Sequence, residues 1–218
     1  MAIRCVVSDF GGVLTTPLMH SFAAFQDQTG IPPEALGVAM QRIATEDGQH
    51  PLYELERGRL SEREFLDRIR EELVAELGHR PEMHGFKDIY FDALDPNPPM
   101  IELMRSLRGR GLRMAMLTNN VREWEPLWRS MLPVDEIFEL VVDSAFVGMR
   151  KPEPEIYELT LTRIRDELGV ADLDPGECLF VDDVEVNIGA ARALGLETVH
   201  FRSNEQAIPE IEAAIGSP

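Results

Sequence analysis

Short apolar runs alternate along the chain with longer stretches in which apolar residues recur every three or four positions. The short runs occupy residues 3–8, 112–117, 137–142, 178–181 and 197–201. Runs of this length are typical of buried strands. The stretch between the third and fourth runs has helical spacing, with Tyr157, Leu161, Ile164 and Leu168 in phase. This alternation predicts an α/β fold, a doubly wound parallel sheet of Rossmann-like type.

The segment from about residue 20 to residue 95 has a different pattern, because helical spacing continues through it without an apolar strand. Phe65, Ile69, Leu73 and Leu77 form the longest apolar stripe. Ser61 lies before this stripe, in a capping-box pattern with Glu64 three residues later. We therefore expect an α/β core domain at residues 1–16 and 96–218 and a helical cap domain at residues 17–95.

Polar residues follow the predicted strands at the points where those strands end. Asp9 follows the first run, Thr118 and Asn119 follow the second, Lys151 lies beyond the third, and the pair at 182–183 follows the fourth. The carboxyl ends of parallel strands meet in one crevice of a doubly wound sheet. The pattern therefore predicts a single site built from all four segments.

The charge balance limits the partners of such a site. The chain carries a net charge of −18 and has a pI of about 4.6, with the charges dispersed. A basic surface for nucleic acid or for an anionic membrane is missing from this pattern. The sequence has no apolar run of about 18 residues and no leader pattern at its start, so we expect a cytoplasmic protein with a small-molecule partner. The oligomeric state is not indicated.

The composition also draws attention to Lys151. Of the 21 basic residues, only Lys87 and Lys151 are lysines. A lysine supplies a compact point charge, whereas arginine presents a planar fork. Each lysine is therefore a candidate for a position that arginine cannot fill.

The pair Asp182 and Asp183 predicts a cation at the site, because adjacent carboxylates repel one another when nothing lies between them. A few hard oxygen ligands suit Mg²⁺. The candidate ligands are Asp9, the backbone carbonyl of Gly11 and Asp183. Asp182 would support these ligands without binding the metal directly. Asn187 has two possible roles, either orienting the water shell of the metal or capping a helix.

A phosphoryl group is the expected substrate of this arrangement. Lys151 would bridge Asp9 and a phosphoryl oxygen. The hydroxyl of Thr118, the backbone N–H of Asn119 and the N–H groups of Phe10 and Gly11 would donate to the other oxygens.

Together these segments resemble the motifs of the haloacid dehalogenase (HAD) superfamily, in the same order and each after an apolar run. The resemblance covers essentially the whole chain. Residues 17–95 resemble the small helical cap of that superfamily. The sequence Leu55-Glu56-Arg57-Gly58 is similar to cap sequences in its phosphatase-like branch, including the phosphatase domain of soluble epoxide hydrolases.

The resemblance implies that Asp9 attacks an electrophile to form an aspartyl ester, which water then hydrolyses. A phosphatase would form an aspartyl-phosphate with Mg²⁺, whereas a dehalogenase would displace halide from carbon without a metal. The pair Asp182 and Asp183 favours the phosphatase, because a metal-free site has no reason to crowd carboxylates. We therefore expect a Mg²⁺-dependent hydrolase that acts on a small phosphate monoester.

Gly11 departs from the pattern of the family phosphatases, which carry a second aspartate two residues after the nucleophile. That aspartate protonates the leaving oxygen and later activates water, and its loss typically costs about 10²–10⁴-fold in rate. Three alternatives follow: a slow phosphatase, a phosphatase for good leaving groups, or a noncatalytic phosphoryl binder.

Trp124 and Trp128 are four residues apart, close after the loop that carries Thr118. This spacing predicts that both lie on one apolar face of a helix. Stacking against the substrate is the alternative.

Overall fold

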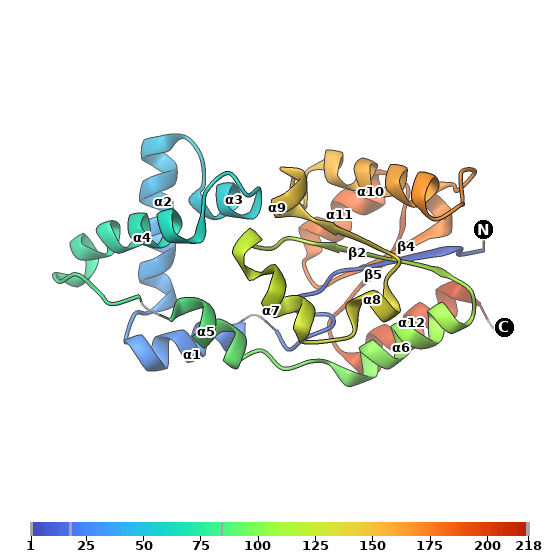
Figure 1. Ribbon diagram of the computed structural model, residues 1–218, viewed down its shortest axis with the longest axis horizontal. Coiled ribbons are helices and arrows are strands. Elements are labelled where there is room, and N and C mark those ends of the chain that lie inside the picture. The colour runs from blue at the N-terminus through green and yellow to red at the C-terminus, as the bar shows by residue number, and fades with distance from the viewer. Residues whose placement is uncertain (1, 18, 84, 217–218) are drawn as a thin grey trace.

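The computed structural model describes residues 2–17, 19–83 and 85–216, and its elements form two groups. A sheet with helices on both faces makes one group, and helices α1 to α5 make the other (Figure 1). The sheet has five parallel strands in the order β3-β2-β1-β4-β5. These strands are β1 (Cys5–Ser8), β2 (Arg113–Thr118), β3 (Leu140–Asp143), β4 (Cys178–Asp182) and β5 (Glu197–His200). The predicted doubly wound fold is confirmed.

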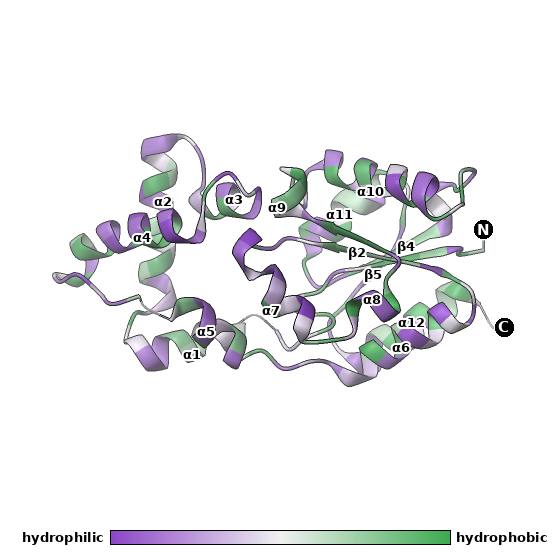
Figure 2. Ribbon diagram, viewed as in Figure 1, coloured by the Kyte–Doolittle hydropathy of each residue, from purple (hydrophilic) through white to green (hydrophobic). Residues whose placement is uncertain are grey.

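The alternation of side chains along each strand builds two apolar layers. Val6 and Met116 point into one layer, whereas Val7 and Leu117 point into the other. Both faces of the central strands are buried, which explains why their sequences are continuous apolar runs. Figure 2 shows these strands as hydrophobic and the outer helix faces as hydrophilic.

Helices cover the two faces of the sheet separately (Figure 1). One face is covered by α6 (Pro98–Gly109), α8 (Val134–Ile137) and α12 (Asn204–Ile215), with η1 (Arg122–Trp124) and α7 (Glu125–Ser130) beside them. The other face is covered by α10 (Pro154–Glu167) and α11 (Glu185–Ala193). The short elements α9 (Ser144–Val147) and η2 (Pro175–Glu177) lie in the connections.

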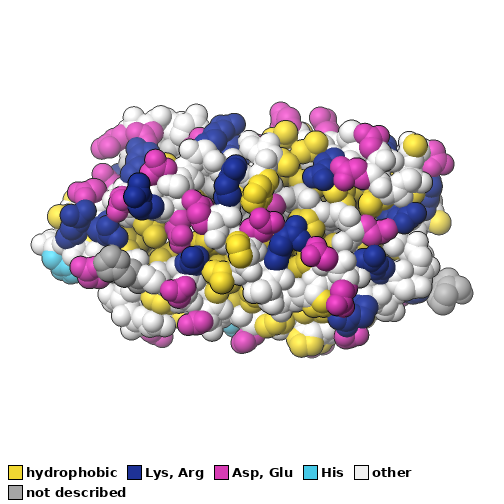
Figure 3. Space-filling model, viewed as in Figure 1, with side chains coloured by type: hydrophobic (Ala, Val, Ile, Leu, Met, Phe, Trp, Pro, Cys, Tyr) yellow, Lys and Arg dark blue, Asp and Glu magenta, His cyan; other side chains and the backbone are white. Residues whose placement is uncertain are grey.

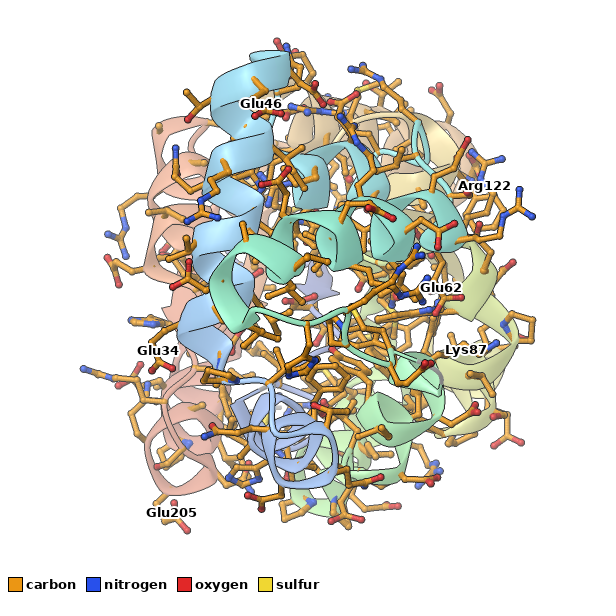
Figure 4. The ribbon with its side chains drawn as sticks, turned by 90° about the vertical axis from the view of Figure 1, so that its left-hand side faces the viewer. Glu34, Glu46, Glu62, Lys87, Arg122 and Glu205 are labelled. Atoms are coloured by element: carbon orange, nitrogen blue, oxygen red, sulfur yellow. The ribbon has the colours of Figure 1, made fainter. Side chains whose placement is uncertain are left out.

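Helices α1 to α5 lie beyond the sheet and are called the cap helices below. They are α1 (Met19–Thr29), α2 (Pro33–Asp47), α3 (Pro51–Glu56), α4 (Glu62–Leu77) and α5 (Phe86–Asp92). The capping box predicted at Ser61 is confirmed, because its side chain accepts from the N–H of Glu64 and the Glu64 carboxylate accepts from the N–H of Ser61. Seen end-on, α2 and α4 cross in front of the rest of the molecule (Figure 4).

The chain leaves the sheet for the cap helices and returns at neighbouring points. Thr15 and Pro96 form an antiparallel bridge, and the N–H of Thr16 donates to the carbonyl of Asp95 at 2.8 Å. The two connections therefore run side by side, so both ends of the cap segment are held at one place.

The third strand begins later than the sequence pattern predicts. Residues 134–137 form the short helix α8, and β3 starts only at Leu140. The N–H of Phe138 donates to the carbonyl of Val134 at 2.8 Å and closes the helical turn. Apolar residues on both sides of this boundary are buried, so hydrophobicity alone could not separate helix from strand.

The surface is acidic overall but mixed in sign. Basic and acidic side chains are interspersed over the face in Figure 3. Both cysteines, Cys5 and Cys178, are free and buried on neighbouring strands. In the described part of the chain, no helix combines the length and apolar character that crossing a membrane requires.

Candidate active site

Asp9 follows directly after β1 and faces a buried lysine. Its Oδ1 atom lies 2.8 Å from the Nζ atom of Lys151, which is also 2.6 Å from Oδ2 of Asp182. Lys151 is 1% exposed, and Phe180 lies beneath its ammonium group. The scarcity of lysine in the sequence thus drew attention to a lysine that is buried between two carboxylates.

Asp182 is surrounded by hydrogen-bond donors. Its Oδ2 atom accepts from Lys151, its Oδ1 atom accepts from the N–H of Val184 at 2.8 Å, and the Asn187 amide lies 3.0 and 3.2 Å from the two oxygens. The backbone carbonyl of Asn187 in turn accepts from the Tyr157 hydroxyl at 3.1 Å. Asp182 therefore fixes Lys151 and has little capacity left for a metal ion.

Asp183 lies against Gly12, in the loop that follows Asp9. A Cβ atom on Gly12 would fall 2.1 Å from Oδ2 of Asp183, and the glycine has φ +74°. Only glycine fits this close approach. Asp9, Asp182 and Asp183, called the acidic cluster below, each offer an oxygen within 4.8 Å of the others.

The charges of the acidic cluster are only partly balanced. Burial raises the pKa of Asp9, Lys151 opposes this, and the neighbouring carboxylates raise the pKa further. Burial and the charge of Asp182 likewise raise the pKa of Asp183. Three carboxylates with one ammonium leave two uncompensated negative charges when ionised. A divalent cation fits this excess and this set of hard oxygen ligands.

The loop after β2 meets the loop that carries Lys151. The Asn119 side chain donates to the Lys151 carbonyl at 3.0 Å and accepts from the Lys151 N–H at 2.9 Å. This paired contact positions Lys151, a role of Asn119 that the sequence did not suggest. The N–H of Phe10, expected to face a phosphoryl oxygen, donates here to Oδ1 of Asp9 at 2.7 Å.

A cavity of about 240 Å³ opens between this end of the sheet and the cap helices. Phe10, Gly11, Thr118 and Asn119 line its sheet side. Most of the remaining lining residues are apolar or aromatic and come largely from the cap helices: Leu36, Met40, Leu52, Leu55, Phe65, Ile69, Met83, Phe86, Tyr90, Phe91, Leu94, Val121 and Trp124. The cavity thus joins a polar end to an apolar chamber.

The two tryptophans differ in their surroundings. Trp124 lines the cavity in contact with Tyr90, at a ring distance of 4.8 Å, whereas Trp128 is fully buried against Phe10 at 5.4 Å. Trp124 ends the 3₁₀ turn η1, and Trp128 lies in α7. The two helical turns are contiguous, and both tryptophans are buried in the same apolar cluster, although only Trp124 lines the cavity.

Sequence reasoning missed two residues near this site. Glu56 at the end of α3 lines the cavity and binds the Arg150 guanidinium, with Nε and Oε2 2.5 Å apart. Nε2 of His200 lies 3.0 Å from the Asp183 carbonyl. No sequence signal marks Glu56, because acidic residues are frequent throughout residues 17–95.

The sequence pattern of the haloacid dehalogenase-like hydrolases matches residues 3–195. The chain belongs to this family. It is therefore a HAD-like hydrolase, and the family resemblance noted from its motifs is confirmed.

Curated relatives include a bifunctional epoxide hydrolase and phosphatases. The HAD-like chain is 28% identical to pig bifunctional epoxide hydrolase 2 over 228 residues, which cover 99% of this chain and 39% of that protein. It is 32% identical to a sesquiterpene phosphatase of Aspergillus oryzae over 130 residues, covering 56% and 59% of the two proteins. The chain thus spans less than two thirds of the length of these curated relatives.

A solved structure shares the arrangement. A HAD family enzyme from Bacteroides thetaiotaomicron, crystallised with magnesium and inorganic phosphate, superimposes with a TM-score of 0.64 and 25% identity. The alignment covers 91% of this chain and 93% of that one. The doubly wound core and the helices beyond it are therefore those of a HAD structure.

Proposed function

We propose that the protein is a Mg²⁺-dependent phosphatase that hydrolyses a small phosphate monoester with an apolar leaving group. The observation that carries this proposal is the buried contact of Asp9 with Lys151 beside an acidic cluster. In this proposal residues 17–95 act as the cap domain and the cavity beneath them holds the leaving group.

Asp9 is the proposed nucleophile. Its carboxylate attacks phosphorus, the bond to the leaving oxygen breaks, and an aspartyl-phosphate forms at Asp9. Lys151 stabilises charge on the phosphoryl oxygens, and Asp182 holds Lys151 in place. The Thr118 hydroxyl and the N–H groups of Asn119 and Gly11 are the proposed donors to the remaining oxygens.

The metal ligands are proposed to be Asp9, the Gly11 carbonyl and Asp183, with Asp182 and Asn187 behind them. Asp183 suits this role because, among the described residues, its carboxylate has no cation within ion-pair distance. Mg²⁺ would supply charge neutralisation at the phosphoryl group. The magnesium and phosphate bound by the Bacteroides relative support this choice.

The lining of the cavity supports an apolar leaving group. A polar metabolite in this chamber would lose water and gain few hydrogen bonds, at a cost in free energy. An apolar chain gains about 0.8 kcal/mol, or roughly fourfold in affinity, for each methylene buried. The relative that acts as a sesquiterpene phosphatase is consistent with this class of substrate.

A turnover screen tests the proposal. Monoalkyl phosphates of increasing chain length and glycerol phosphate would be assayed for phosphate release with and without Mg²⁺. We expect release only with the metal, and kcat/KM that rises with chain length until the cavity is full.

The same screen includes 2-haloacids, because a dehalogenase is the alternative chemistry of this fold. Halide release without metal would replace the phosphatase proposal. Phosphate binding by calorimetry without turnover of any ester would instead indicate a noncatalytic phosphoryl binder.

A further inference from the structure

Glu56 is chemically distinct from the other residues that line the cavity. Among the lining residues that the structure describes, it alone carries a charged side chain. It ends α3, on the cap side of the chamber, and shares that chamber with Gly11 and Thr118 of the core. A carboxylate in an otherwise apolar wall loses hydration, so its presence requires a reason.

Among the described residues that line the cavity, the core side contributes no carboxylate that could transfer a proton. Gly11 offers no side chain two residues after the nucleophile. Asp182 is surrounded by Lys151, Asn187 and a backbone N–H. Asp9 and Asp183 are the proposed nucleophile and metal ligands. The proton needed by the leaving oxygen must therefore come from another part of the molecule.

The Glu56 side chain is held in place but retains a free oxygen. Oε2 lies 2.5 Å from Nε of Arg150, and the Arg150 guanidinium stacks 4.0 Å from the centre of the Tyr53 ring. Oε1 accepts no hydrogen bond from any residue that the structure describes. The side chain is 15% exposed. One oxygen thus fixes the carboxyl group while the other remains available.

Burial makes this carboxyl group hold its proton more tightly than an exposed glutamate does. Desolvation raises the pKa of Glu56 above its ordinary value, and the positive charges of Arg150, Lys151 and Arg57 oppose this only in part. A pKa closer to the working pH improves both donation and uptake of a proton.

We propose that Glu56 is the general acid and base of this enzyme, supplied by the cap in place of the aspartate missing at Gly11. This inference rests on the phosphatase function proposed above. The carboxyl group of Glu56 gives its proton to the leaving oxygen as the bond from phosphorus to that oxygen breaks, which releases an alcohol. The resulting carboxylate then takes a proton from water as the water oxygen bonds to phosphorus. The bond from phosphorus to Asp9 breaks, and phosphate leaves.

Tyr90 is the competing donor, because its phenol also lines the cavity. Burial raises the pKa of Tyr90 well above its ordinary value, and the charges of Asp9, Glu56 and Asp183 raise it further. A phenol held in this state is a poor acid for the first step, and its phenolate is too scarce to activate water in the second. Tyr90→Phe is therefore a control that keeps the shape of the wall.

The decisive variant is Glu56→Gln, assayed with two substrates in the presence of Mg²⁺. An alkyl phosphate needs a proton on its leaving group, so its turnover should fall by roughly 10²-fold. Nitrophenyl phosphate releases nitrophenolate without a proton. With this substrate we expect a burst of about one nitrophenolate per site, followed by a steady rate roughly 10²-fold below wild type, because the water that attacks the aspartyl-phosphate has lost its base.

The matched control is Glu54→Gln. Glu54 lies on the same helix and pairs with Arg57, but it does not line the cavity. A purely structural effect on the cap should slow both substrates equally and give no burst. The burst in Glu56→Gln and its absence in Glu54→Gln and Tyr90→Phe would support the proposal.

Rescue in the double variant provides a second readout. Adding Gly11→Asp to Glu56→Gln restores a carboxyl group beside the nucleophile. The described glycines with positive φ do not include Gly11, so the backbone at this position can accept an aspartate. We expect alkyl phosphate turnover to recover by about 10-fold or more.

The outcomes separate this inference from the proposed function. If the wild-type protein turns over both esters and Glu56→Gln is equally active, the proposed role of Glu56 is overturned and the phosphatase function stands. An equal loss on both substrates, with no burst and no rescue, would assign Glu56 to the structure of the cap. No wild-type turnover of either ester would overturn the phosphatase proposal and this inference together.

Discussion

The two sides of the cavity are built on different physical principles. On the core side, polar groups hold one another through short contacts, such as Lys151 between Asp9 and Asp182. On the cap side, the described lining residues are apolar or aromatic apart from Glu56. In the proposed function the core side binds and attacks the phosphoryl group, whereas the cap side selects the leaving group and supplies one carboxyl group. Substitutions on the two sides should therefore differ in whether their effects depend on the substrate.

The largest effect is expected on the core side, from Asp9→Asn. An amide is not a competent nucleophile, so phosphate release should fall by at least about 10⁴-fold for every ester. A loss of phosphate release that varied with the leaving group would contradict this distinction between the core side and the cap side. Circular dichroism and thermal unfolding would confirm that the fold is kept, and full activity would remove Asp9 from the mechanism.

Asp183→Asn should weaken metal binding by at least about 10²-fold, because the amide removes a charged ligand. Calorimetric titration of Mg²⁺ measures the change. Asp172→Asn is the control, since this exposed aspartate pairs with Arg4 away from the cavity. Equal affinity in the wild-type protein and Asp183→Asn would show that the metal lies elsewhere.

Lys151→Arg should lower kcat by about 10²-fold although the charge is kept. The space around Lys151 is closed, and a planar guanidinium cannot contact Asp9 and Asp182 as a point charge does. Lys87→Arg, at the other lysine of the chain, is the matched control. Similar rates in the two variants would contradict the assigned role of Lys151.

A smaller and selective effect is expected on the cap side, from Met40→Trp. The larger side chain fills part of the cavity, so kcat/KM should fall by about 10-fold for long alkyl phosphates and change little for short ones. Gln41→Trp, an exposed position on the same helix, is the control. A uniform loss across chain lengths would show that the cap wall does not select substrates.

The core side was also the more predictable of the two from sequence. Each strand end could be located because an apolar run stops at a polar residue, and parallel strands must bring such ends together. Asp9, Lys151, Asp182 and Asp183 meet as this rule requires. The hydrogen bonds from Asn119 to the Lys151 backbone could not be foreseen, because they depend on how two loops approach.

The cap side was predictable only as a set of helices. Helical spacing located the stripe of Phe65, Ile69 and Leu73, all buried, but not the side of each helix that faces the sheet. That choice depends on packing between cap and core. One such contact is the Trp124 indole, which donates to Glu62 at the start of α4. In Figure 4, Glu62 and Arg122 lie on the same side of the molecule.

Two consecutive residues connect these sides. Arg150 holds Glu56 of the cap, and Lys151 holds Asp9 of the core. Arg57 next to Glu56 also pairs with Glu153, so residues 150–153 contact the end of α3 through two ion pairs. One short segment thus anchors the cap helices and the lysine beside the proposed nucleophile to the same stretch of backbone.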